Sequence, residues 1–292
     1  MIIYLSGETP PTAPKFREAG MDRTYVVTGA DSGIGAATSR YLRERGGRVI
    51  ACDLHDADVI ADLTNADGRA ALVDGVTRVS GGRIDAIVAN AGGGAPESSL
   101  SLNFFGAVAT LEGLRPLLAA SAAPRAVAVS SIAVLRPPHP AIVEACLKMD
   151  EPGAIAAARA MIAAGRRPRP DADPLPDEAQ TPLELYGAAK YALQRWCRSA
   201  ATQPQWAGAG IILNVASLGV FDTPAAAYIL SDPASRAAMG SMVPMRNAFP
   251  GRPEEAAAVL AWFVSPENSQ MTGQILYVDG GFECRARGDR MP

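Results

Sequence analysis

The stretch Tyr25-Val26-Val27-Thr28-Gly29-Ala30-Asp31-Ser32-Gly33-Ile34-Gly35 decides the fold of this 292-residue chain. Its β-branched start predicts a strand, and the glycines that follow predict a tight turn into a helix over residues 36–45. Glycines let a backbone approach a pyrophosphate closely, and a helix start offers free N–H groups and a positive dipole end. Any tight strand-to-helix turn also needs glycine, so this stretch alone leaves a structural turn and a phosphate site both open.

A second strand-like run, residues 48–52, ends at Asp53, which stands 20 residues after Gly33. A carboxylate at this position is placed to accept hydrogen bonds from the ribose hydroxyls of an adenine dinucleotide. Asp53 alone could be an ordinary surface residue at a strand end. Together with the glycines, it predicts a dinucleotide-binding site.

Much later in the chain, Tyr186 and Lys190 stand four residues apart in the stretch Tyr186-Gly187-Ala188-Ala189-Lys190. This spacing places both side chains on one face of a helix. An ammonium beside a phenol favours the phenolate and lowers a pKa that is otherwise near ~10. Such a phenol can pass a proton to or from an alcohol or a ketone. The spacing also arises often by chance, so the pair acquires its meaning from the glycine-rich stretch.

These motifs, with others in the same order, resemble the classical short-chain dehydrogenases/reductases over residues 22–284. The spacing Thr28-Gly29-x-x-x-Gly33-x-Gly35 is similar to that of the family, and residues 272–281 resemble its last strand. Asp62-Leu63 resembles the pair that flanks the adenine, and Asn90-Ala91-Gly92 resembles the turn beside the cofactor. The implied fold class is α/β, a doubly wound and mostly parallel Rossmann sheet.

The resemblance implies four catalytic residues, namely Asn103, Ser131, Tyr186 and Lys190. Tyr186 would be the acid in reduction and the base in oxidation, and Lys190 would lower its pKa and bind the nicotinamide ribose. Ser131 would donate a hydrogen bond to the substrate oxygen. Asn103 would fix a water behind Lys190 that completes a proton path. Read singly, Ser131 could merely end a strand and Asn103 could cap or kink a helix.

The resemblance also implies a set of cofactor contacts. The predicted cofactor-binding residues are Gly29, Asp31, Ser32, Gly33, Ile34, Gly35, Asp53, Leu54, Asp62, Leu63, Asn90, Ala91, Gly92, Tyr186, Lys190 and Thr223. NAD(H) is the predicted cofactor, because Asp53 would repel the 2′-phosphate of NADP and no Arg or Lys follows it directly. Leu218 departs from the family at a position usually held by proline, which removes a fixed φ from the turn beside the nicotinamide.

Within the family, the chain most resembles the bacterial 3α-hydroxysteroid dehydrogenase/carbonyl reductase group, through residues 52–63 and a long insertion before Tyr186. We expect one domain over residues 21–292, with residues 1–20 as a disordered extension. The insertion, at about 136–182, predicts two short helices at 140–149 and 153–164 and a proline-rich linker at 166–182. It could be a wall or lid of the substrate pocket, a solvated decoration or an oligomer contact.

The composition narrows the class of protein. A net charge of −3 gives no electrostatic reason to expect binding to nucleic acid or to an anionic membrane. No apolar stretch reaches the ~20 residues of a spanning helix. The four cysteines are scattered, which favours free thiols and a cytoplasmic location. His55 and His139 share no metal-ligand spacing, so no metal site is expected.

The segment after the sixth predicted strand (residues 211–215), at 222–251, would be a second lid and is rich in methionine and other apolar residues. It favours an apolar secondary alcohol or its ketone, of cyclic, steroidal or aromatic type. A homodimer through residues 254–264 and 274–278 is expected, with a tetramer possible. Two alternatives are a cofactor-binding regulatory protein without catalysis and an epimerase or dehydratase of the same fold. The glycine spacing disfavours the second.

Overall fold

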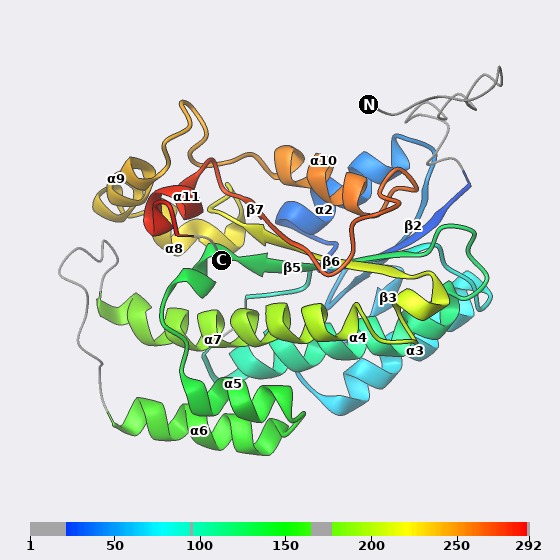
Figure 1. Cartoon of the computed structure of the whole chain (residues 1–292), viewed down its shortest axis with the longest axis horizontal. Helices are drawn as coiled ribbons and strands as arrows, with labels where there is room; N and C mark the ends of the chain where they lie inside the picture. Colours follow the sequence, from blue (N-terminus) through cyan, green and yellow to red (C-terminus); the bar gives the residue numbers. More distant parts are fainter. Residues whose placement is uncertain (1–21, 94–95, 165–176, 291–292) are drawn as a thin grey trace, which may run out of the picture.

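A seven-stranded sheet forms the centre of the computed structural model, which describes residues 22–93, 96–164 and 177–290 (Figure 1). The strand order is β3-β2-β1-β4-β5-β6-β7, and every pairing between neighbours is parallel. The strands are β1 (Thr24–Thr28), β2 (Arg48–Asp53), β3 (Val59–Ile60), β4 (Ala86–Ala89), β5 (Arg125–Ser131), β6 (Ile212–Leu218) and β7 (Ile275–Val278). The prediction of a doubly wound parallel sheet is confirmed.

Helices cover both faces of this sheet (Figure 1). On one face lie α2 (Gly33–Arg43) and α10 (Pro253–Phe263), and on the other lie α3 (Ala66–Ser80), α4 (Ala107–Leu114) and α7 (Asp177–Ala200). The helices outside these two layers are α5 (Pro140–Leu147), α6 (Glu151–Ala163), α8 (Ala227–Leu230), α9 (Pro233–Met242) and α11 (Phe282–Arg287). A π-helix, η2 (Ser101–Gly106), leads into α4, and a 3₁₀ turn, η4 (Ile132–Leu135), follows β5.

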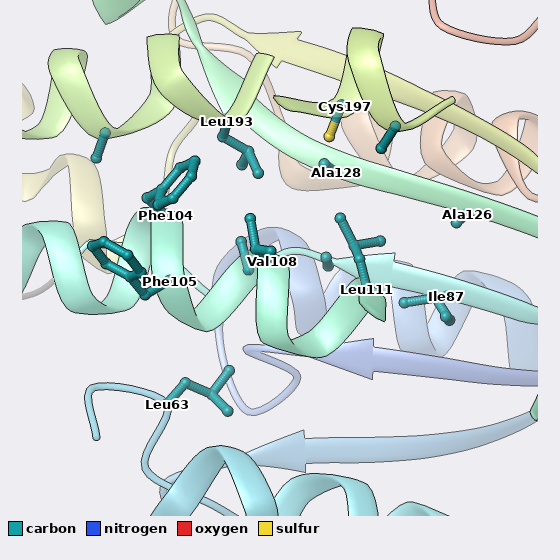
Figure 2. Packing of buried hydrophobic residues seen from close by; sticks show 14 of the residues in the cluster. Leu63, Ile87, Phe104, Phe105, Val108, Leu111, Ala126, Ala128, Leu193 and Cys197 are labelled. Atoms are coloured by element: carbon teal, nitrogen blue, oxygen red, sulfur yellow. The ribbon is translucent and has the colours of Figure 1, made fainter. Parts of the chain in front are cut away.

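Alternate residues of the central strands contribute side chains to two separate hydrophobic cores, one on each face of the sheet. On β1, Val26 belongs to the core under α3, α4 and α7, while Val27 belongs to the core under α2 and α10. This division follows from the two-residue repeat of a strand whose two faces are both buried. In the first core, Phe104 of η2, Leu111 of α4, Leu193 of α7 and Ala128 of β5 belong to one buried cluster (Figure 2). These cores fix the positions of the strand ends, and so of the site described below.

The described part of the predicted insertion is a packed layer rather than a decoration. Its two helices, α5 and α6, lie under α7 (Figure 1), and Ile142, Cys146 and Met161 are buried in the same core as α7. The predicted linker is partly wrong, because α7 already begins at Asp177 and contains Pro182. The N-terminal extension and most of the linker lie outside the described residues.

Two other boundaries differ from the prediction. β6 continues to Leu218, three residues beyond its predicted end, because Ser130 and Ser131 of β5 and Tyr277 and Val278 of β7 pair with its last residues. Residues 254–264, expected to form a dimer contact as the last helix of the chain, correspond to α10, but a short helix, α11, follows the last strand. Among the described residues, no helix is long and apolar enough to cross a membrane.

Candidate active site

A cavity of about 1670 Å³ opens at the carboxyl ends of β1, β2, β4, β5 and β6. In an open parallel sheet this edge is where ligands bind, because side chains and helix N-termini converge there. The predicted residues that line it are Gly29, Ser32, Gly33, Ile34, Asp53, Leu54, Asp62, Leu63, Asn90, Ala91, Gly92, Ser131, Tyr186, Lys190 and Thr223. Asp31, Gly35 and Asn103 do not line it, although each lies close behind a residue that does.

The glycine-rich turn forms one end of this cavity. Gly29 adopts a φ of 68°, and its N–H donates to the Cys52 carbonyl at 2.9 Å, which joins the turn to β2. Gly35 has no room for a side chain, because a Cβ there would strike the Gly29 carbonyl. The Ser32 side chain makes no hydrogen bond to the first turn of α2. The turn therefore presents a close backbone and a helix start to the cavity, which suits a pyrophosphate.

Asp53 is held at the end of β2 by two backbone amides. One carboxylate oxygen accepts from the Asp31 N–H at 2.9 Å and the other from the Leu54 N–H at 2.7 Å. Asp31 thus positions Asp53 through its backbone instead of lining the cavity itself. The carboxylate retains lone pairs for ribose hydroxyls, because each oxygen can accept more than one hydrogen bond.

Asp62 and Asn90 stabilise the cavity wall near the glycine-rich turn through hydrogen bonds. Both the N–H and the hydroxyl of Thr64 donate to one Asp62 oxygen, at 2.9 and 2.7 Å, and these bonds lower the Asp62 pKa. The Asn90 amide donates to the carbonyls of Thr28 and Gly29 at 3.0 and 3.2 Å. Asn90 therefore ties the end of β4 to the glycine turn.

Ser131 and Tyr186 both line the other end of the cavity, and the serine hydroxyl lies close enough to affect the pKa of the phenol. Ser131 ends β5, and its Oγ accepts from the Ala133 N–H at 3.2 Å as η4 begins. Gly187, next to Tyr186, lets η4 approach α7 closely, because a Cβ there would lie 2.8 Å from the Ala133 carbonyl oxygen. This close approach of η4 brings the serine and the tyrosine together.

The expected lowering of the Tyr186 pKa is contradicted by the structure. Burial raises this pKa to about 12, although the Ser131 hydroxyl opposes the shift and the phenol of Tyr228 adds to it. Lys190 Nζ lies 5.7 Å from the centre of the Tyr186 ring, over its face. Desolvation therefore outweighs the attraction that sequence spacing alone suggested.

Lys190 is almost completely buried, and its ammonium donates to the Val129 carbonyl at 2.8 Å. Burial lowers its pKa to about 8. Asn103 lies nearby in the π-helix, where its amide exchanges hydrogen bonds with the backbone of Gly93 at 3.0 and 2.9 Å. A Cβ on Gly92 would approach both Asn103 Oδ1 and Lys190 Nζ, so the amide and the ammonium flank the same backbone position.

Gln194, one turn beyond Lys190 on α7, is a buried polar residue that sequence reasoning missed. Its Nε2 donates to Ser130 Oγ at 3.0 Å and to Ser217 Oγ at 3.2 Å. These two bonds join β5 to β6 beneath the site. Its i, i+4, i+8 spacing from Tyr186 and Lys190 was the available signal.

A second missed pair fixes the insertion to the cofactor end. Arg69 of α3 binds the Glu151 carboxylate of α6 through two nitrogens, at 2.6 and 2.8 Å. The same guanidinium donates to the carbonyl of Leu63 at 2.9 Å. The insertion and the loop that carries Leu63 are therefore held by one side chain.

The wall of the cavity beyond Tyr186 is mainly apolar. It is lined by Leu135, Met161, Ile162, Leu183, Ile229 and Met239, of which Met161 and Ile162 come from the insertion. Arg136 and Tyr228 also line it and are its cationic and phenolic groups on this side. Of the alternatives for the insertion, a pocket wall is the one that these contacts support.

Comparison with known families matches both halves of the chain. The family described as "short chain dehydrogenase" matches residues 23–143, and the one described as "Enoyl-(Acyl carrier protein) reductase" matches residues 177–283. A 3-alpha-hydroxysteroid dehydrogenase/carbonyl reductase of Comamonas testosteroni is 33% identical, over 90% of this chain and 97% of that protein. A cis-4-hydroxycyclohexanecarboxylate dehydrogenase of Sinomonas cyclohexanicum is 31% identical, over 91% and 98%.

Solved structures give the same result. The 3-alpha-hydroxysteroid dehydrogenase of Pseudomonas sp. B-0831, complexed with NADH, superposes with a TM-score of 0.79 at 32% identity, covering 92% of this chain and all of that one. The RhlG/NADP complex of Pseudomonas aeruginosa gives a TM-score of 0.67 at 26% identity, covering 90% and 96%. These two neighbours hold different nicotinamide cofactors, so similarity alone does not choose between them.

Proposed function

Because the chain belongs to the short-chain dehydrogenase/reductase family, we propose that it is an NAD(H)-dependent oxidoreductase that interconverts an apolar secondary alcohol and its ketone. The observation that carries this proposal is the meeting of Ser131, Tyr186 and Lys190 at one end of a cavity whose other end is a glycine turn. The alcohol would be cyclic, steroidal or aromatic, as the apolar wall and the two relatives named above suggest.

The residues would share the work of proton transfer. When bound, the nicotinamide accepts or supplies a hydride. The Ser131 hydroxyl and the Tyr186 phenol, which line the same end of the cavity, would hold the substrate oxygen between them. Tyr186 would donate its proton in reduction and accept one in oxidation. Lys190 would hold the nicotinamide ribose, and its positive charge would favour the phenolate form of Tyr186.

NAD is favoured over NADP by the position of Asp53. Its carboxylate is fixed at the end of β2, on the cavity wall, by two backbone amides. A phosphate on the adenosine ribose would meet this negative charge, whereas free hydroxyls would donate to it. No Lys or Arg is among the described residues that line this end, apart from the buried Lys190.

A test that separates catalysis from mere cofactor binding uses purified protein, NAD and a panel of cyclic, steroidal and aryl secondary alcohols. We expect NADH absorbance to rise with at least one alcohol and to be lost in Tyr186→Phe. Retained NADH binding, seen by fluorescence, without turnover of any alcohol would favour a cofactor-binding regulatory protein instead.

We also propose a homodimer through α10 and β7. The β7 strand is the edge of the sheet, and all four of its residues are at least partly exposed, with Leu276 40% exposed. The α7 face, which could carry a tetramer contact, is instead covered by α5 (Figure 1). Light scattering of the wild type and of Leu276→Asp tests this. A dimer mass that Leu276→Asp converts to a monomer mass is expected, and a tetramer mass would contradict it.

A further inference from the structure

The cavity wall beyond Tyr186 carries a cationic side chain, Arg136, among the residues that the structure describes. Of the described residues that line the cavity, only Lys190 and Arg136 are cationic. Lys190 is 1% exposed and bound to the Val129 carbonyl, whereas Arg136 is only partly buried. A substrate that enters this end therefore meets the Arg136 guanidinium.

Arg136 stands at a fixed separation from the catalytic serine. Ser131 begins the η4 turn and Arg136 ends it, with the Arg136 N–H donating to the Ala133 carbonyl at 3.2 Å. Ile132 and Val134 of this turn are buried, which holds it in place. The turn therefore places the two residues at its opposite ends.

Tyr228 on α8 joins this pair as a second hydrogen-bond donor. Burial raises the Tyr228 pKa while the Arg136 charge opposes the shift, and the Tyr228 phenol in turn raises the Tyr186 pKa. The Arg136, Tyr228 and Tyr186 side chains therefore lie close enough to influence one another electrostatically, and all three residues line the cavity.

Two carboxylates also line this end and would oppose an anion. The Asp232 carboxylate is occupied as the cap of α9, where it accepts from the Ser235 N–H at 2.8 Å. Glu184 lines the same cavity from α7, so binding of an anion requires the Arg136 contact to outweigh its negative charge.

We propose that the substrate is an apolar hydroxy acid, or the matching keto acid, and that Arg136 binds its carboxylate with Tyr228 as a second donor. This inference rests on the proposed oxidoreductase function. A guanidinium presents five donors in a fork that fits a carboxylate with two bonds, so it can bind one and keep contacts within the protein. In oxidation the carbinol C–H passes as hydride to NAD⁺, the hydroxyl proton passes to Tyr186, and the carboxylate is unchanged.

The test compares each acid with its own methyl ester, which keeps the shape and removes the charge. Two acids are used, 4-hydroxycyclohexanecarboxylate and a 3-hydroxysteroid with a carboxylate side chain, each beside its methyl ester. The quantity measured is kcat/KM with NAD. We expect the wild type to prefer at least one acid to its ester by about 10–100-fold, the range of a hydrogen bond to a charged group. Arg136→Gln should reduce that ratio to about one, and Arg136→Lys should restore part of it.

A matched control is Arg159→Gln, since Arg159 is exposed on α6 and does not line the cavity. It should leave the acid-to-ester ratio unchanged. If the wild type uses both acids no better than their esters, or if Arg136→Gln lowers acid and ester in the same proportion, the proposal is overturned.

Calorimetric titration with cyclohexanecarboxylate and cyclohexanecarboxamide, neither of which can be oxidised, separates the two proposals. Binding of the acid that is at least tenfold weaker in Arg136→Gln, together with no NADH from any alcohol, would uphold the anion site and contradict the oxidoreductase function. Turnover of neutral alcohols with no Arg136-dependent binding would uphold the oxidoreductase function and overturn the anion site.

Discussion

The Lys190 ammonium lies 2.8 Å from the carbonyl oxygen of Val129, in a place where Lys190 is only 1% exposed. A carbonyl dipole compensates a buried charge only in part, and the Lys190 pKa accordingly falls to about 8. The protein thus keeps a charge in its interior that is costly to bury, at a position predicted to contact the cofactor ribose.

This burial predicts a particular pH dependence of stability. Between pH 8 and 10.5, the unfolded chain keeps a proton on Lys190 that the folded chain has released, so the free energy of unfolding should rise with pH. Below pH 8 both states are charged and the destabilisation is complete. Urea unfolding without cofactor measures this in the wild type and in Lys190→Met. From pH 7 to 9.5, the free energy of unfolding of the wild type should rise relative to that of the variant. A difference that stays constant with pH would contradict this.

Tyr186→Phe should lower kcat by about 10²–10⁴-fold, because it removes the proton donor and acceptor. NADH binding should be nearly unchanged, since the ring remains. Tyr191→Phe is the matched control, on the same helix but outside the cavity lining. Equal losses in both variants would show that the effect is structural.

Gln194→Leu should destabilise the fold by about 1–3 kcal/mol, because the Ser130 and Ser217 hydroxyls would lose a buried partner. Thermal unfolding measures this, and Gln203→Leu, at an exposed glutamine near the end of α7, should change the midpoint little. Since Ser217 precedes Leu218, we expect Gln194→Leu to raise KM for NAD as well. An unchanged KM would show that the network supports the sheet and not the cofactor turn.

Glu151→Gln should destabilise the chain by about 1–3 kcal/mol, because Arg69 would lose a charged partner in a site where it is only 12% exposed. The exposed pair of Glu144 and Lys148 on α5 provides the control. Glu144→Gln should leave the unfolding midpoint nearly unchanged. Similar shifts in the two variants would contradict the fixed attachment of the insertion.

The wild type should use NAD with a kcat/KM at least about tenfold above that with NADP, the ratio set by ~1.4 kcal/mol of repulsion. Asp53→Ala combined with Leu54→Arg should reduce this ratio, because the carboxylate is replaced and a cation is added beside the ribose position. Initial rates with both cofactors measure it. Equal wild-type efficiency with NADP would contradict the preference for NAD.

Much of this fold could be predicted from short motifs, because they are set by local demands. The turn at Gly29 needs a positive φ and Gly35 needs the absence of a side chain, and both requirements are visible in the sequence. The four predicted catalytic residues are similarly marked by order and spacing.

Other features depend on contacts between distant segments and leave little trace in a sequence. The pairing of Arg69 with Glu151 joins residues 82 positions apart, and the Tyr186 pKa depends on burial that no spacing reveals. β6 ends at Leu218, beyond its predicted end. Pairing with Ser131 and Val278 on the neighbouring strands extends it, and the sequence of β6 alone does not show this pairing.

Arg69 attaches α6 to the loop that carries Leu63. This attachment couples two equilibria, the binding of a ligand at that loop and the docking of the insertion. A ligand that orders the Leu63 loop must favour the docked insertion, and a docked insertion must favour that ligand by the same factor. Amide hydrogen exchange in α5 and α6 should therefore slow when the dinucleotide binds, although neither helix contains a predicted cofactor contact. The wall of the substrate pocket would then be most ordered when the dinucleotide is bound.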